Sequence, residues 1–514
     1  MIAAVTAAAA AWTASRSALF LPLLWVALLL GILALPPERR RLFGTRWLLA
    51  GCALLMVSWV VALDHELAMR HSLLALGAAL LFGLTRVAAP GDRVVDSVAV
   101  AIAATSLVAL GQWASGLGGA LELVDTLAPA LREAAATRLA GGRVFGTSAL
   151  PGHFAALLLL AVPLLASRVA GTRGRVRVTW TLVLLPLALA FALTRSLAGF
   201  LVGGALVPLA AAGRGVRRWH VVLAAAIAVA AVGVAATRAD LGRLEPLALR
   251  WVNWRTTAGV AAAHPWTGVG LGGVGQAGLV LPGAAENITP YTHNTWLQLF
   301  AEFGLAGAGL VVAGAWAIVG LVRRSLTDHR PLALAVAVVP LHNVVDFSAY
   351  APEVVLPWAF LAGALASRSG PEPARPVPAA ALVPVLALGC LLSAAGWRAE
   401  TALARATAGP PAETAGRALA AARWAPWAVT PVLVAADALR SGSGNADGLR
   451  ATDEALADRW WVRPRSAAWA ESRAMLLLAR GRPGEAEVWA REARRRAPHR
   501  GELAALEDAC RLAR

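Results

Sequence analysis

Long apolar runs separated by short arginine-rich gaps dominate this 514-residue chain. A helix needs about 20 apolar residues to cross the hydrocarbon core of a bilayer, and about 17 at the short end. Hydrophobic residues make up 58% of the chain and charged residues only 15%, whereas soluble domains have nearer one half and one quarter. The sequence therefore predicts an all-α fold, a polytopic transmembrane helical bundle of about 12 spans. The runs lie near residues 17–35, 47–63, 72–88, 94–112, 150–168, 178–194, 196–212, 219–236, 295–322, 331–346, 352–367 and 377–396.

Two further segments need a decision. Residues 2–14 are a candidate extra span, although they are too rich in Ala to insert strongly. As one helix, residues 178–212 would be about 52 Å long at 1.5 Å per residue, far more than the bilayer core. We therefore expect two spans that turn at Thr194-Arg195-Ser196.

The charges of the gaps predict the orientation of the bundle. Alternate gaps hold 18 Arg against 4 acidic residues, and the positive-inside rule assigns such gaps to the cytoplasm. The two longest loops, 113–149 and 237–294, and the C-terminal tail then face the other side. We expect a multi-pass protein of the bacterial inner (cytoplasmic) membrane, whose net charge of +17 reflects topology and not binding to nucleic acid.

The composition changes after residue 396 to a soluble, helical pattern rich in Ala, Arg and Glu. We therefore divide the chain into a membrane domain, 1–396, and a soluble helical domain, 397–514. Its small and apolar residues match the 34-residue tetratricopeptide unit best in the last repeat, which predicts a platform for a protein partner. A plain helical tail is the alternative. The matching residues are Ala474, Leu477, Gly481, Ala486, Ala493 and Pro498.

Candidate chemistry gathers on the predicted extracytoplasmic side, because few charges lie inside the spans. Asp96 lies at the inner end of its span, and Glu302 lies one to two turns into the helix that begins near residue 295. The sequences RWVNWRTTAGVAAAHPWTGVGLGGVG (250–275) and YTHNTWLQLFAEFGLAG (291–307) hold the most informative residues. A proton relay at the membrane midplane is therefore less well supported than an outer-face site.

The second of these segments resembles the bacterial O-antigen ligase family, which includes O-antigen polymerases and protein O-oligosaccharyltransferases. His293-Asn294, nine residues, then Gly304-x-x-Gly307 matches the family signature His-Asn-x9-Gly-x-x-Gly. Upstream and downstream blocks occur in the same order between about residues 140 and 367. They are Arg250, Trp254, His264-Pro265, Gly268 and Gly270; Arg143-x-x-Gly146 with Pro151; and His342-Asn343-x-x-Asp346-Phe347 with Pro352.

This chain departs from the family at two positions. The usual Asn after Pro151 is Gly152, which is followed by His153. Many members carry Thr-x-Ser-Arg at the outer turn, whereas this chain reads Thr194-Arg195-Ser196-Leu197. Its arginine is displaced by two residues.

The resemblance implies glycan transfer from undecaprenyl diphosphate to an acceptor hydroxyl, with no cofactor and no metal. Guanidinium groups suit the diphosphate, and the four candidates are Arg143, Arg195, Arg250 and Arg255. His293 would accept the proton of the attacking hydroxyl. Asn294 is placed to cap the helix that begins near Thr295, whose N-terminus would favour an anion. The remaining supporting candidates are Glu302, Gly304, Gly307, His264, His342 and Asp346.

Each of these residues also has a simpler structural interpretation. His293 could be a solvated or capping residue, His264 a turn residue before Pro265, and His342 with Asp346 a pair that stabilises a helix end. For the whole chain, the alternatives are a lipid-linked-glycan flippase or transporter, and a membrane-anchored scaffold for the tail. The acceptor is a lipid or glycan, or a protein, and membrane lipids surround the bundle.

Overall fold

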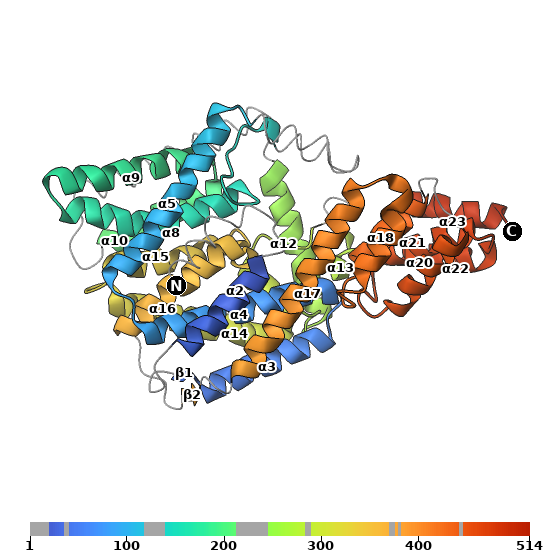
Figure 1. The fold of residues 1–514 in the computed structure, drawn as a ribbon, viewed down its shortest axis with the longest axis horizontal. Coiled ribbons are helices and arrows are strands. Elements are labelled where there is room, and N and C mark those ends of the chain that lie inside the picture. Colours follow the sequence, from blue (N-terminus) through green and yellow to red (C-terminus); the bar gives the residue numbers. More distant parts are fainter. Residues whose placement is uncertain are drawn as a thin grey trace.

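The structure is a computed structural model that describes residues 20–34, 41–117, 139–211, 245–282, 289–369, 376–378, 382–440 and 446–514. These residues form helices joined by short connections (Figure 1). One short antiparallel ladder pairs β1 (Arg41–Gly44), in a connection predicted on the cytoplasmic side, with β2 (Pro376–Pro378), at the start of the predicted span 377–396. The predicted helical fold is confirmed, with this ladder as its small exception.

Each predicted span within the described residues coincides with a helix. The predicted span 219–236 and the stretch 2–14 lie outside the described residues. Within the described part of the chain, five helices (α4, α5, α8, α9 and α14) could cross a membrane by length and composition, and apolar stretches of α2, α10 and α15 are shorter. The helices are α2 (Phe20–Leu33), α3 (Thr45–Val60), α4 (His65–Ala88), α5 (Asp92–Ala114), α8 (Pro151–Gly171), α9 (Gly174–Leu193), α10 (Leu197–Ala211), α14 (Thr295–Ser325), α15 (Arg330–His342), α16 (Pro352–Ser369) and α17 (Val383–Ala408).

The core of the membrane domain lies between α4, α5, α8, α15 and α16. Its side chains are mainly Leu, Ala and Val, and small residues let the helices approach closely. A Cβ on Gly363 of α16 would lie 2.5 Å from the carbonyl oxygen of Phe82 on α4. In contrast, only 11% of the apolar window of α9 or of α14 is buried, which leaves both helices a broad apolar surface. Such a surface fits contact with lipid.

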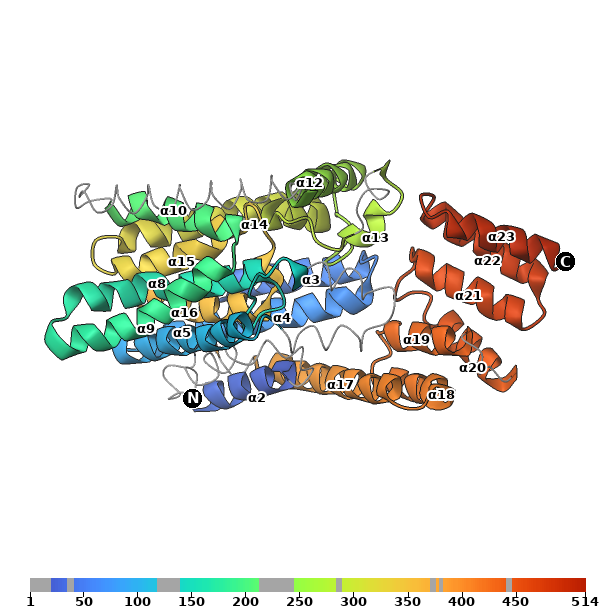
Figure 2. The same cartoon turned by 90° about the horizontal axis from the view of Figure 1, so that it is seen from above.

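Residues 178–212 form two helices, as the length argument predicts. α9 ends at Leu193, α10 begins at Leu197, and Arg195 in the turn has a left-handed backbone with φ of 46°. The chain therefore reverses at this turn. As a result, the α9–α10 turn lies at the same end of the bundle as the starts of α8, α14 and α16 (Figures 1 and 2).

The predicted outer loop 237–294 contains α12 (Glu245–Ala263) and α13 (Val274–Gly278). α12 packs against α14, and both α12 and α13 lie at the end of the bundle that faces the C-terminal helices (Figure 2). The arginine-rich connections 171–174 and 325–330 lie at the opposite end. This separation agrees with the charge pattern on which the orientation was predicted.

The C-terminal helices pack in antiparallel succession and extend from one end of the bundle (Figure 1). α17 crosses the predicted boundary at residue 396 without a break, so the division between the two domains falls inside a helix. α21 and α22 form a tight pair around Ala474, Leu477 and Ala486, with Gly481 at φ of 70° in the turn. The assignment of this pair as a tetratricopeptide-like unit stays a prediction. The tail helices are α18 (Pro411–Ala422), α19 (Thr430–Ala438), α20 (Ala446–Asp458), α21 (Ala467–Ala479), α22 (Pro483–Arg496) and α23 (Glu502–Leu512).

The tail is fastened to the first turn of α4 by charged hydrogen bonds. Asp64 caps α4 by accepting from the Leu67 amide (2.9 Å) and also pairs with Arg463 of the tail (2.9 Å). Glu66 accepts from Arg463 (3.1 Å) and from the Thr430 amide and hydroxyl (3.2 and 3.0 Å). The His65 amide donates to the Val462 carbonyl (2.8 Å). Because charge-assisted bonds are the stronger kind, they fix the tail against the α3–α4 turn.

Candidate active site

His293 immediately precedes α14 and has an unusual backbone. Its φ of 57° lies in the left-handed region, which costs energy for a non-glycine residue and is found at functional sites. The next residue, Asn294, accepts a hydrogen bond from the Leu297 amide (3.0 Å) and so caps the helix, as predicted. The Trp254 indole donates to the His293 carbonyl (3.3 Å). The imidazole is thereby projected from a fixed point at a helix N-terminus.

Thr292, the residue before His293, is also fixed by hydrogen bonds. Thr292 is buried, its amide donates to the Gln298 side chain (3.0 Å), and its hydroxyl lies 2.9 Å from that of Thr257 on α12. Hydrogen bonds on both sides therefore maintain the left-handed conformation of His293.

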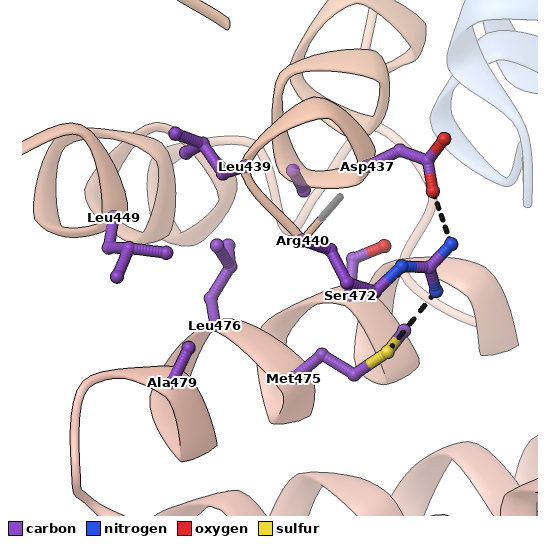
Figure 3. Close-up of a pocket in the computed structure, with 9 residues that line it drawn as sticks. Asp437, Leu439, Arg440, Leu449, Ser472, Met475, Leu476 and Ala479 are labelled. Carbon is purple, nitrogen blue, oxygen red and sulfur yellow. Dashed lines mark hydrogen bonds and ion pairs between the residues drawn. The ribbon is translucent and has the colours of Figure 1, made fainter. Parts of the chain in front are cut away.

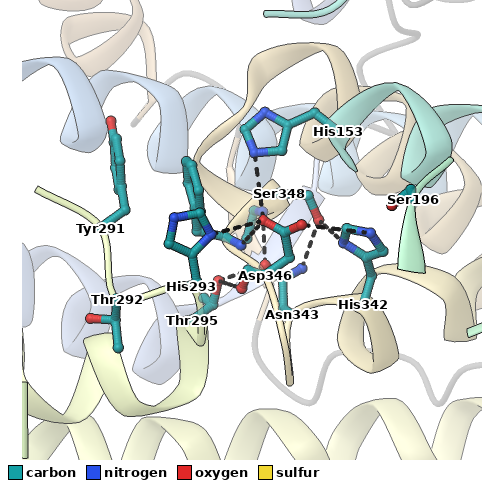
Figure 4. Close-up of polar contacts among 12 residues, drawn as sticks. His153, Ser196, Tyr291, Thr292, His293, Thr295, His342, Asn343, Asp346 and Ser348 are labelled. Carbon is teal, nitrogen blue, oxygen red and sulfur yellow. Dashed lines mark hydrogen bonds and ion pairs between the residues drawn. The ribbon is translucent and has the colours of Figure 1, made fainter. Parts of the chain in front are cut away.

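Asp346 is the centre of the site (Figure 4). Its buried carboxylate faces Nδ1 of His293 (3.8 Å), Nε2 of His153 (3.9 Å), Nε2 of His342 (4.0 Å) and the guanidinium of Arg250 (3.8 Å). These groups come from α8, α12, α15 and the start of α14. One carboxylate thus joins four segments that are far apart in the sequence.

The position of Asp346 is set by the connection between α15 and α16, outside either helix. Its Oδ1 accepts from the Phe347 amide (2.8 Å), and its carbonyl accepts from the Thr295 amide (3.2 Å). Burial alone would raise the pKa of Asp346. The contact with His293 and the other three groups outweighs burial, so the pKa lies well below its usual range. Asp346 is therefore a buried anion at neutral pH.

Arg143 and Arg195 lie together at the α9–α10 turn, which borders Asp346. Arg143 donates to the Thr194 carbonyl (2.8 Å), one residue before the exposed Arg195. A Cβ on Gly152 would lie 2.8 Å from Oδ2 of Asp346 and 4.0 Å from the hydroxyl of Ser196 in that turn. The start of α8 therefore brings the turn beside the carboxylate.

The two predicted arginines of α12 point in different directions. Arg250 faces Asp346, with 24% of its side chain exposed. Arg255 is exposed and follows five residues later, which turns it about 140° around the helix from Arg250. The structure brings Arg250 to His293 and leaves Arg255 on another face.

Glu302 and the glycines build the scaffold under His293. Glu302 is fully buried and accepts from the Gly272 amide (2.9 Å), the Gln298 side chain (2.9 Å) and the Tyr350 hydroxyl (2.7 Å). Burial and Glu302 raise the pKa of Tyr350 well above its usual value, which keeps this hydroxyl a donor. Glu302 therefore ties α14 to the segment that carries Asp346.

α14 is kinked at Gly304, whose φ and ψ are 60° and −139°. The kink frees the Leu305 amide, which donates to the Pro265 carbonyl (2.9 Å). A Cβ on Gly304 would lie 2.5 Å from the Trp266 carbonyl oxygen, and one on Gly307 would lie 2.2 Å from the Leu299 carbonyl oxygen. Both glycines are needed because backbone, not side chain, packs here.

His264 takes the place of a turn residue. Its carbonyl accepts from the Gly268 amide (3.1 Å), and partial burial together with Arg465 of the tail lowers the pKa of its imidazole. His342 is fully buried, and its Nδ1 lies 3.1 Å from the Ser348 hydroxyl. His342 thus contacts Asp346 inside the buried site, whereas His264 lies in the turn before the loop that packs against Gly304.

Several further residues line this site that were not predicted from the sequence. His153 and Glu353 are both buried, and the Phe347 ring contacts His153 and His293 edge-on at 4.7 Å each and stacks on Tyr291 at 4.4 Å. His153 and Glu353 directly follow Pro151-Gly152 and Pro352. Both lie in the first turn of a helix that begins at the predicted outer edge, and that position was the available signal.

A separate cavity of about 320 Å³ lies in the tail between α19, α20 and α21 (Figure 3). At its rim, Arg440 pairs with Asp437 and donates to the sulfur of Met475 (3.3 Å), so its charge is compensated. The cavity lacks an imidazole among its lining residues and belongs to the predicted partner-binding platform. Within the described residues, no group of three His, Cys, Asp or Glu side chains could hold a metal ion.

The described helices thus form an apolar bundle with an imidazole, a buried carboxylate and arginines at one end. Residues 180–312 match the family model of O-antigen ligase, which supports the resemblance found in the sequence. No curated protein and no solved structure matches the chain. The matched residues include Arg195, Arg250, Arg255, His293 and Asn294, whereas Arg143 and Asp346 lie outside them. The domain supports a multi-pass membrane protein with glycosyltransferase activity of the O-antigen ligase or polymerase type.

Proposed function

We propose that the chain transfers a glycan from undecaprenyl diphosphate to an acceptor hydroxyl at the extracytoplasmic face of the bacterial inner membrane. The product would be a cell-surface polysaccharide, by ligation or by polymerisation. The observation that carries the proposal is the shared carboxylate of Asp346, which His293 and Arg250 both face at 3.8 Å. In this proposal, the shared carboxylate would keep a proton acceptor next to a phosphate-binding group.

The arginines would hold the donor. A diphosphate at the membrane surface carries about two negative charges, and planar guanidinium groups bind such oxygens in pairs. Arg250 lies beside His293, and Arg143 and Arg195 border the same site from the α9–α10 turn. The N-terminus of α14, capped by Asn294, adds amide groups that favour an anion. We assign Arg255 a lesser part, because it lies on another face of α12.

The reaction is a displacement at the anomeric carbon of the donor sugar. The acceptor oxygen forms the new bond to this carbon while the bond from the carbon to the diphosphate oxygen breaks. His293 takes the proton of the acceptor hydroxyl, and undecaprenyl diphosphate leaves with the bonding electrons. General base catalysis of this kind contributes about 100- to 10,000-fold.

Asp346 would orient His293 and stabilise its protonated form. A neutral imidazole that donates through Nδ1 to Asp346 presents Nε2 as the proton acceptor. The 3.8 Å separation is longer than a hydrogen bond and can close as the imidazole gains charge.

The experiment compares His293→Ala with a matched control, His499→Gln, an exposed histidine of the tail. Membranes from cells that lack the chain supply the accumulated lipid-linked glycan and its unmodified acceptor. Purified full-length protein in lipid nanodiscs is added, and glycan transferred to the acceptor is measured with and without a chelator. We expect transfer by the wild type and by His499→Gln in both conditions, and none by His293→Ala. Full transfer by His293→Ala would refute the proposal.

The same cells distinguish the alternatives. If the chain is a flippase, cells that lack it should accumulate the lipid-linked glycan on the cytoplasmic face of the membrane. If it is a transferase, these cells should accumulate the glycan on the outer face. A scaffold would retain its function in His293→Ala cells. The tail would bind a protein partner in either case, and its cavity is the surface to test.

A further inference from the structure

His153 lies between two buried carboxylates. Its Nε2 is 3.9 Å from Oδ1 of Asp346, and its Nδ1 is 3.8 Å from Oε1 of Glu353. The three side chains are 6%, 5% and 4% exposed, respectively. Two carboxylates therefore share one imidazole in a site that water barely reaches.

The protonation of this imidazole follows from counting donors. A neutral imidazole has one N–H and one lone pair, so it can face only one carboxylate favourably. An imidazolium has two N–H groups and can face both. Among the described residues, Nε2 of His153 has no hydrogen-bond partner that would occupy it elsewhere. A cation at this position also offsets one of two buried negative charges, which are costly when unpaired.

At the start of α8, His153 is the residue whose side chain can lie between the two carboxylates. At the preceding position a side chain cannot enter, because a Cβ on Gly152 would lie 2.8 Å from Oδ2 of Asp346. The Phe347 ring packs edge-on against both His153 and His293, at 4.7 Å from each ring centroid. The two imidazoles that this ring contacts both face Oδ1 of Asp346 (Figure 4).

We propose that His153 is a positioning residue, an imidazolium that bridges Asp346 and Glu353 and so holds the Asp346 carboxylate against His293. This inference rests on the proposed function, in which His293 is the base. Glu353 is then the anchor of the bridge. Without the cation, Asp346 and Glu353 would repel each other, and Asp346 would move from His293.

The bridge also sets the charge around the base. The titratable and charged groups that face His153 directly or through Asp346 come from α12, α15, α16, the α15–α16 connection and the segment just before α14. Loss of one positive charge here makes the surroundings of the base more negative, which favours its protonated, inactive form. The acid limb of the activity profile should therefore move to higher pH when the cation is lost. These groups are Asp346, Glu353, His293, His342 and Arg250.

Three variants test the bridge in the transfer assay described above: His153→Gln, Glu353→Gln and the double variant. His153→Gln should lower kcat about 10- to 100-fold, since displacement of a catalytic group by about 1 Å has this effect. Its acid limb should move up by about one pH unit, and its Kd for undecaprenyl diphosphate should stay within about twofold. The double variant removes one charge of each sign, so its acid limb should return close to that of the wild type, and its kcat should return close to that of Glu353→Gln.

A role in packing alone predicts a different result, because neutralising Glu353 would not restore a lost ring. The inference is wrong if His153→Gln has wild-type kcat and pH profile, or if the double variant is no better than His153→Gln. If His153→Gln does not fold, the neutral double variant carries the test, and its failure to fold or to act also overturns the inference. Activity of His293→Ala would instead overturn the proposed function, so the two failures are distinguishable.

Discussion

Replacement of Asp346 by Asn should slow transfer while tightening donor binding. The substitution keeps the size of the side chain and removes only its charge. Asp346 faces the proposed base, His293, and the proposed phosphate-binding residue, Arg250, at equal distances of 3.8 Å. Loss of the Asp346 charge should therefore slow glycan transfer and strengthen donor binding.

The size of the effect on catalysis follows from the distance. Two unit charges 3.8 Å apart interact by about 4 kcal/mol at an effective dielectric constant of about 20. This is the stabilisation that the protonated imidazole of His293 would lose in the transition state. At about 1.4 kcal/mol per tenfold change in rate, kcat should fall about a thousandfold.

The effect on binding has the opposite sign. Asp346 competes with the diphosphate for Arg250 and repels the phosphate oxygens, so undecaprenyl diphosphate should bind Asp346→Asn more tightly than wild type. Binding can be followed by tryptophan fluorescence and kcat by the nanodisc transfer assay. Wild-type kcat, or weaker binding together with lower kcat, would refute the reasoning because either result would mean that Asp346 does not serve the base.

Two further predictions concern stability. Gly304→Ala forces a Cβ to within 2.5 Å of the Trp266 carbonyl oxygen and should destabilise the fold by about 2–5 kcal/mol. A thermal unfolding curve checks this against Gly309→Ala, where a Cβ meets nothing within 4 Å; equal stability of the two would contradict it. Arg463→Ala leaves Asp64 and Glu66 without their cation and should weaken tail docking by about 2 kcal/mol, seen as faster hydrogen exchange at residues 429–430. The exposed Arg450→Ala is its control, and unchanged exchange in Arg463→Ala would show that the ion pairs are not the fastening.

Hydrophobic run length and arginine placement were sufficient to predict most of the membrane helices. The turn at Arg195 followed from bilayer thickness alone, and the cap at Asn294 followed from local side-chain chemistry. These features depend on residues close together in the chain. Sequence reasoning is strongest where the physics is local.

The remaining features depend on long-range packing. Arg250 and Arg255 could not be separated because the loop that holds them was not expected to be a helix, and a helix phase decides which of them faces Asp346. Predicting that His153 on α8 meets Glu353 on α16 requires knowing how far one helix is shifted along the other. The composition of the sequence does not give this shift. The docking of Glu66 on the tail likewise joins segments more than 360 positions apart.

The α3–α4 turn has a consequence for how the chain can be shortened. Its Leu63 amide donates to the Val269 carbonyl of the loop over α14, while the neighbouring His65 amide donates to Val462 of the tail. A truncated protein that ends before the tail would expose Asp64 and Glu66 at the rim of the membrane domain and loosen the support of the loop beside Glu302. The C-terminal helices therefore help to keep the loop beside Glu302 in place, and we expect that deleting them will lower the proposed transfer activity.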